Sequence, residues 1–187
     1  YVRDLKELYK KYDYVGSMYG HFGQGCIHSR INFELQSQAG VEKYRRFAQE
    51  AADLVVSYGG SLSGEHGDGQ ARGELLERMY GAELIAAFRE FKRIWDPDWK
   101  MNPGKVIDPY RLDENLRLVN YAPHQVETTF KYPDDKRSFA RVAFRCVGVG
   151  KCRSDSGTMC PSYMVTREEK HATRGRARLL FEVMNGE

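Results

Sequence analysis

The chain has 187 residues, enough for one ordinary domain or two small ones. Hydrophobic residues make up 41% and charged residues 29%, which excludes a disordered tail, a collagen or a coiled coil as the main body. No apolar run approaches the roughly 18 residues of a spanning helix, and no basic-then-apolar leader is visible. We therefore expect a cytoplasmic protein without a transmembrane segment, peripheral attachment at the inner membrane face being the alternative. The opening at Tyr1 in helix-like sequence leads us to interpret the chain as part of a larger protein.

Helical and strand-like patterns alternate in the first part of the chain. Apolar residues at helical spacing predict three helices, over residues 1–12, 44–58 and 75–95. Gly81 is a candidate interruption of the third helix, whose aromatic stripe predicts a core contact through Phe88, Phe91 and Trp95. Residues 26–35 alternate like a strand with one apolar face and one face that carries Cys26, His28 and Arg30.

The second part of the chain differs in charge and in order. Residues 131–178 carry 12 Lys and Arg against 5 Asp and Glu, a net charge of +7, whereas residues 1–130 have a net charge of −2. The most basic stretch, residues 167–178, has no interleaved aromatic residues beyond the nearby Tyr163, so we do not expect nucleic-acid binding. The elements expected elsewhere in the chain are short strands at 61–63 and 128–132 and helices at 139–145 and about 174–184, the last capped by Asn185-Gly186.

Two glycine-rich loops hold the residues with the clearest chemistry. His21 lies just before a turn and His28 in the strand after it, so the turn can bring both imidazoles toward one point. Glu65 and His66 lie together in the second loop. Two imidazoles and one carboxylate suit a divalent metal with open positions, and the fourth side chain can act beside it as a base. The alternatives are histidines that only bind loop backbone, or a metal-dependent hydrolase with water in the open position.

Three segments resemble one known family. Gly20-His-Phe-Gly-Gln-Gly-Cys-Ile-His28, Ser63-Gly-Glu-His-Gly-Asp-Gly69 and Met101-Asn-Pro-Gly-Lys105 are similar, in order and spacing, to motifs of the FAD-linked oxidase C-terminal domain. The members in question are D-lactate, glycolate and D-2-hydroxyglutarate dehydrogenases. The resemblance covers about residues 1–110, as the second half of the substrate domain.

The resemblance implies a role for each matching residue. His21, His28 and Glu65 would hold a divalent metal, usually zinc and sometimes manganese or iron. His66 would be the base that removes the hydroxyl proton, and Asn102 would lie near the flavin or the substrate. Two positions depart from the family pattern, since Cys26 stands where many members have Asn and Gln24 where they have Asp.

The residues describe a coherent reaction of their own. A 2-hydroxy acid can chelate a metal through its carboxylate and hydroxyl, a neighbouring imidazole can take the hydroxyl proton, and a hydride can leave C2 for a flavin. Arg30 follows His28 on the same strand face and could pair with the substrate carboxylate, or form only a surface salt bridge.

Three of the four cysteines cluster near the end of the chain, at Cys146, Cys152 and Cys160. Thiolates in a glycine-rich loop that ends in Cys-Pro are typical of ferredoxin-type clusters, although Val149 occupies the usual middle Cys position. The stretch from Cys146 to Leu180 resembles the iron–sulfur domain of large FAD/Fe–S oxidoreductases. The missing ligand would then come from a later motif; otherwise the loop has lost its metal, or the thiols are free and buried.

These expectations combine into one prediction of fold and function. The fold is α+β: residues 1–110 form part of a ferredoxin-like antiparallel sheet with covering helices, 111–138 a linker, and 139–187 a short, mostly helical start of an iron–sulfur domain.

The full-length protein would oxidise a small D-2-hydroxy acid, of D-lactate or D-2-hydroxyglutarate type. A hydride would pass to FAD and electrons through a 4Fe-4S cluster to an unidentified acceptor. The chain alone is expected to be inactive, and a non-catalytic electron-transfer or docking module remains the other alternative.

Overall fold

The computed structural model describes residues 1–157 and 159–186 and divides them into two compact units. Unit 1 covers Tyr1–Asn120 and unit 2 covers residues 121–187. One small antiparallel sheet and several helices make up the described chain, so the α+β prediction is confirmed. Among the described residues no helix is both long and apolar enough to cross a membrane.

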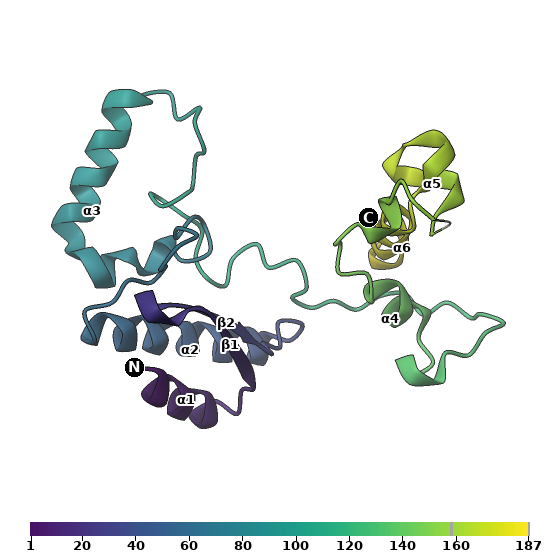
Figure 1. Ribbon diagram of the computed structural model, residues 1–187, viewed down its shortest axis with the longest axis horizontal. Helices are drawn as coiled ribbons and strands as arrows, with labels where there is room; N and C mark the ends of the chain where they lie inside the picture. The colour runs from purple at the N-terminus through teal and green to yellow at the C-terminus, as the bar shows by residue number, and fades with distance from the viewer. Residues whose placement is uncertain (158, 187) are drawn as a thin grey trace. The chain divides into compact units, whose positions relative to one another are not determined.

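Unit 1 is built from a two-stranded hairpin and three main helices (Figure 1). In chain order these elements are α1 (Val2–Lys11), β1 (Gly16–His21), β2 (Cys26–Ile31), α2 (Gln38–Ser57) and α3 (Leu76–Trp95). The predicted helices at 1–12 and 44–58 are thus present, the second starting six residues earlier than its apolar repeat. The short strand expected at 61–63 is absent, and those residues form a bend without a ladder partner in the part of the chain described.

The hairpin register follows from a short turn. β1 and β2 pair antiparallel from Gly16 opposite Ile31 to His21 opposite Cys26. A 3₁₀ turn over Phe22–Gln24 joins them, and Gly25 closes it with φ 72° in the left-handed region that glycine favours. β2 is shorter than its alternating sequence predicts, because pairing stops at Ile31.

The residues after β2 start the next helix. The Glu34 carboxylate accepts hydrogen bonds from the backbone amides of Gln36 and Ser37. The Ser37 side chain in turn accepts from the Gly40 amide as the N-cap of α2. The local turn around Glu34 therefore replaces strand pairing at the point where α2 begins.

The core of unit 1 lies between α1, α2 and the inner face of the hairpin. Leu5 and Tyr9 of α1 pack with Phe47 of α2 and with Tyr14, all at most 7% exposed. Full burial of such a side chain contributes about 1.5–3 kcal/mol. The Tyr9 hydroxyl donates to Ser29 Oγ at 2.8 Å, which fixes α1 against β2.

A second contact ties α2 to the segments on either side of α3. Arg45 of α2 forms ion pairs with Glu74 and with Asp113, and Glu74 Oε2 also accepts the Leu112 amide at 2.6 Å. These side chains are only 20–25% exposed. Residues Ala52, Leu75 and Leu112 form a buried apolar cluster beside this ion-pair network.

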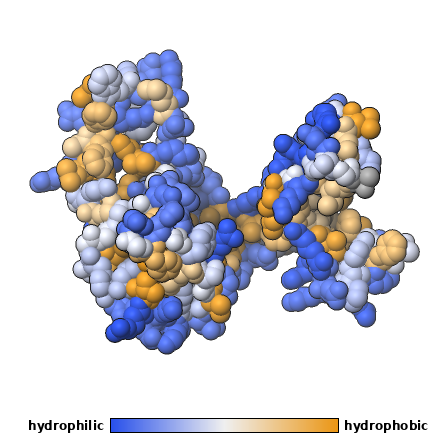
Figure 2. Space-filling view, viewed as in Figure 1, coloured by the Kyte–Doolittle hydropathy of each residue, from blue (hydrophilic) through white to orange (hydrophobic). Residues whose placement is uncertain are grey.

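The third helix departs from its prediction in one respect. Gly81, with φ 77° and ψ 160°, interrupts α3 as expected. The predicted core contact is wrong for Phe91 and Trp95, which are 64% and 69% exposed, whereas Phe88 is half-buried and packs edge-on with Tyr80. After its first turn α3 runs away from α2 and the hairpin (Figure 1), and apolar side chains remain visible over this part of unit 1 (Figure 2). The apolar residues do recur at helical spacing, but this spacing does not show whether another surface packs against them.

Unit 2 is mostly helical. Its α-helices are α4 (Phe139–Phe144), α5 (Pro161–Thr166) and α6 (Thr173–Asn185), so the helices expected at 139–145 and 174–184 are present. Gly186 ends α6 in the left-handed conformation, as the Asn-Gly pair predicted. Tyr121 stacks on the buried Phe181 of α6, and Phe144 packs against both rings. The strand expected at 128–132 is not formed in the described structure.

Replacing Glu74 with Ala should lower the free energy of unfolding by about 1–3 kcal/mol, because Arg45 and the Leu112 amide lose a partly buried acceptor. Urea denaturation followed by circular dichroism measures the change. Glu83→Ala is the matched control, since Glu83 is an exposed residue of α3 and its loss should change stability by no more than about 0.5 kcal/mol. Equal effects of the two substitutions would show that the ion-pair network is not stabilising.

Candidate functional site

The hairpin presents one face to the loop that holds Glu65. Side chains alternate along a strand, so the face that carries His28 also carries its neighbours two residues away, Cys26 and Arg30. In the register, Tyr19 lies opposite His28 and His21 opposite Cys26. The sequence pattern predicted this grouping on β2, and strand pairing adds Tyr19 and His21 from β1.

Gly20 is required for the two strands to come this close. Its φ of 137° lies in a region that side chains disfavour. A Cβ at this position would lie 2.5 Å from the Cys26 carbonyl oxygen and 3.0 Å from Cδ2 of the His28 ring. The glycine therefore allows the close approach of His28 to β1.

The Glu65 carboxylate is the centre of the site. Its Oε2 lies 2.9 Å from His28 Nε2, 3.6 Å from His66 Nε2 and 3.7 Å from Cys26 Sγ. Its Oε1 lies 3.7 Å from His21 Nε2. The structure therefore brings together all four residues singled out from the two glycine-rich loops, and it adds Cys26 to them.

Aromatic rings pack around His28. Its ring stacks on Tyr19 with centroids 5.2 Å apart, and the His66 ring lies 4.7 Å away. Arg30 lies over the Tyr19 ring at 5.3 Å, and its Nε donates to the Tyr19 hydroxyl at 3.2 Å. His28 is thus packed between neighbouring rings, with 22% of its side chain exposed, while His66 is 71% exposed and open to a reactant.

The electrostatics of the site agree with this geometry. The hydrogen bond from His28 lowers the pKa of the Glu65 carboxyl, with a further lowering from His66 and His21. Partial burial, together with the Glu65 charge, raises the pKa of the Cys26 thiol. Glu65 is therefore ionised and available as an acceptor or ligand at neutral pH.

A cavity of about 320 Å³ adjoins these residues. Tyr19, Cys26, His28, Glu65 and His66 line it, and so does Arg72, which the sequence reasoning did not single out. Arg72 donates to the Gly67 carbonyl at 2.6 Å, so it braces the Glu65 loop. Such a volume admits a small organic acid.

The donor atoms on this face fit a divalent cation. Imidazole nitrogens and a carboxylate oxygen are the ligands of catalytic zinc sites. Cys26, His28 and Glu65 offer a sulfur, a nitrogen and an oxygen that all lie within 4.8 Å of one another.

Asn102 is not among the residues that line this cavity in the described chain. It lies in the turn after α3, with φ 47°, and is exposed. The structure therefore does not bring Asn102 into contact with the histidine cluster, and its expected place near a flavin stays a prediction.

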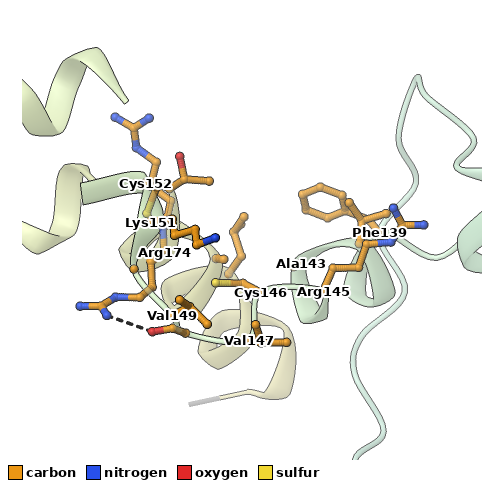
Figure 3. Close-up of a pocket in the computed structure, with 16 residues that line it drawn as sticks. Phe139, Ala143, Arg145, Cys146, Val147, Val149, Lys151, Cys152 and Arg174 are labelled. Carbon is orange, nitrogen blue, oxygen red and sulfur yellow. Dashed lines mark hydrogen bonds between the residues drawn. The ribbon is translucent and has the colours of Figure 1, made fainter. Parts of the chain in front are cut away.

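The cysteines of unit 2 lie near the start of α6. Cys146 and Cys152 line a cavity of about 550 Å³, together with Val149 and Arg174 (Figure 3). Cys152 Sγ accepts a hydrogen bond from the Arg174 backbone amide at 3.4 Å. The cavity wall is therefore both apolar and cationic.

Cys160 has a separate environment at the N-cap of α5. Its Sγ lies 3.7 Å from the Thr173 hydroxyl and from the Ser162 hydroxyl. Hydrogen bonding, first from the Tyr163 backbone amide and then from Thr173 and Ser162, lowers the pKa of the Cys160 thiol to about 7. The lowered pKa favours the thiolate form that binds metals, while the protonated thiol donates to the His171 carbonyl at 3.4 Å.

Comparison with known proteins gives a consistent result for unit 1. The family model described as FAD linked oxidases, C-terminal domain, matches residues 1–106. A D-lactate dehydrogenase from Archaeoglobus fulgidus is 35% identical over 57% of the chain and 23% of its own length.

Two further relatives match almost the whole chain. The D-2-hydroxyglutarate dehydrogenases of Pseudomonas putida and Haemophilus influenzae are 32% and 29% identical over 97% of the chain. The chain spans only 18% of the length of these two relatives. No solved structure matches the chain.

Substituting Gly20 by Ala should disrupt the hairpin and lower the free energy of unfolding by about 1–3 kcal/mol, because the new Cβ meets backbone at 2.5 Å. Gly23→Ala, in the connecting turn, is the control, since a Cβ there meets nothing within 4 Å. Chemical denaturation gives the stability, and amide hydrogen exchange of residues 16–31 reports on the hairpin. Unchanged exchange in Gly20→Ala would contradict the close approach described here.

Proposed function

The chain belongs to the family of the C-terminal domain of FAD-linked oxidases, and we propose on this basis that it is part of a flavin-dependent D-2-hydroxy acid dehydrogenase. The observation that carries the proposal is the convergence of three imidazoles on the Glu65 carboxylate beside a cavity of small-acid size. The activity belongs to the full-length protein, and this chain by itself is expected to be inactive. We place it in the cytoplasm or at the inner face of the membrane.

D-2-hydroxyglutarate is the substrate that we favour over D-lactate. The relatives whose similarity extends over 97% of the chain are named D-2-hydroxyglutarate dehydrogenases, whereas the D-lactate dehydrogenase above matches over 57%. A five-carbon dicarboxylate also offers a second negative charge. Arg72 lines the cavity, and Arg30 packs over Tyr19, which also lines it. Each of these two cations could pair with one carboxylate of the substrate.

His21, His28 and Glu65 would hold a divalent metal, zinc by the chemistry of the donors and manganese or iron as alternatives. When bound, the metal would supply a Lewis acid that lowers the pKa of the substrate hydroxyl. Tyr19 fixes the His28 ring by stacking, so the nitrogen that faces Glu65 is held in place before any ligand arrives.

His66 is the general base of the proposed reaction. Its ring lies beside His28 and is mostly exposed, so it can reach a hydroxyl that enters the cavity. His66 would take the hydroxyl proton, and the C2 hydride would leave to FAD, so that the alcohol becomes a 2-oxo acid. Arg30 would pair with the substrate carboxylate once its guanidinium leaves the Tyr19 ring.

Unit 2 would carry the electrons onward through a 4Fe-4S cluster held by Cys146, Cys152 and Cys160. Support comes from the shared cavity of Cys146 and Cys152 and from the lowered pKa of Cys160. Since Val149 occupies the usual place of a fourth cysteine, that ligand would come from another part of the full-length protein. The final electron acceptor is left open.

His66→Ala in the full-length protein should lower kcat/KM for D-2-hydroxyglutarate by about 100-fold or more, because the base is removed, while the metal content stays unchanged. His124→Ala is the matched control, since His124 is an exposed residue of unit 2. Anaerobic bleaching of the flavin gives the rate. Equal rates in the two variants, or turnover of ester substrates in place of flavin bleaching, would contradict the proposal.

Cys152→Ser should reduce the iron content of the full-length protein and weaken its broad visible absorption, since one thiolate ligand is lost. Ser156→Ala, an exposed position in the same loop, should leave both unchanged. Iron analysis together with the visible spectrum measures the effect. Wild-type protein without iron would refute the cluster while leaving the dehydrogenase reaction intact.

A further inference from the structure

Cys26 occupies a place in the site that none of the proposed roles uses. It is the first residue of β2 and lies on the same strand face as His28. Its thiol is free and half-buried, and its Sγ lies 3.7 Å from Glu65 Oε2. The sulfur therefore points at the same carboxylate oxygen that His28 contacts.

The backbone of the second loop holds the sulfur in this place. A Cβ added at Gly64 would lie 3.1 Å from Cys26 Sγ, closer than ordinary packing allows. The thiol thus fills the space beside the residue that directly precedes Glu65. Glycine at position 64 lets the sulfur and the carboxylate approach from the same side.

The separations among three donor atoms fit a common cation. Cys26 Sγ, a His28 ring nitrogen and a Glu65 carboxylate oxygen all lie within 4.8 Å of one another. Zinc–sulfur and zinc–nitrogen bonds of about 2.3 and 2.0–2.1 Å in a tetrahedron place two such ligands about 3.5 Å apart. The 3.7 Å between Cys26 Sγ and Glu65 Oε2 is close to that value.

We propose that Cys26 is a direct ligand of the divalent metal, together with His28 and Glu65, in the place that the proposed function gives to His21. The inference rests on the proposed function, because it assumes that the cluster binds a metal. On binding, the sulfur–metal bond forms as the thiol proton passes to solvent. A soft thiolate favours zinc over manganese, so Cys26 would also set the metal preference of this chain.

X-ray absorption at the zinc edge of the full-length protein tests the proposal, because iron and flavin do not contribute to that edge. Wild-type protein reconstituted with one equivalent of zinc should show one sulfur neighbour at about 2.3 Å. Cys26→Ser should lose the sulfur and bind zinc at least about 10-fold more weakly. His21→Ala, which changes a neighbouring residue of the same cluster, should keep the sulfur.

Cys146→Ser controls for zinc bound by the cysteines of unit 2. Loss of the sulfur neighbour in that variant, but not in Cys26→Ser, would overturn the proposal. Wild-type zinc with only nitrogen and oxygen neighbours would also overturn it, and would leave the metal site itself standing. Failure of wild-type protein to bind zinc, manganese or iron stoichiometrically would instead remove the metal from the proposed function.

Alkylation gives an independent measurement if Cys26→Ser does not fold. In wild-type protein, zinc should protect Cys26 from iodoacetamide, as mapped by mass spectrometry. Manganese at the same concentration should protect it less, because a thiolate binds that metal more weakly. Equal labelling of Cys26 with and without bound zinc would contradict direct ligation.

Discussion

The meeting of three imidazoles and one thiol at the Glu65 carboxylate is the arrangement on which the interpretation of unit 1 depends. A carboxylate surrounded by neutral or cationic groups stays ionised, and the His28 hydrogen bond lowers its pKa further. The hairpin and the second loop bring the imidazole and thiol donors to the Glu65 carboxylate, and the cavity leaves space beside it. The aromatic core of α1 and α2 supports the hairpin from its opposite face.

The two units supply different chemistry from separate sets of contacts. In unit 1, nitrogen and oxygen donors surround a cavity of small-acid size. In unit 2, the Thr173 hydroxyl and the Arg174 backbone amide at the start of α6 contact the sulfurs of Cys160 and Cys152. The proposed function assigns substrate oxidation to the first set of donors and electron transfer to the second.

Local sequence signals predicted much of the fold, and they singled out the histidines that gather at Glu65. Hydrophobic periodicity and glycine placement identified the main helices other than α5, the break at Gly81 and the turn between His21 and His28. The exposure of Phe91 and Trp95 could not be predicted, because helical spacing marks an apolar stripe without naming its partner. The contact of Cys26 with Glu65 joins residues 39 positions apart, and no local pattern encodes that distance.

The pairing of β1 with β2 places a strict demand on the length of their connection. Tyr19, Cys26 and His28 share a face only in the observed register. A single-residue insertion or deletion between Phe22 and Gly25 would shift β2 by one position and turn its reactive side chains toward the aromatic core. Mutation should therefore be able to change the residues at 22–24, but neither Gly25, with its left-handed backbone, nor the number of residues in the turn.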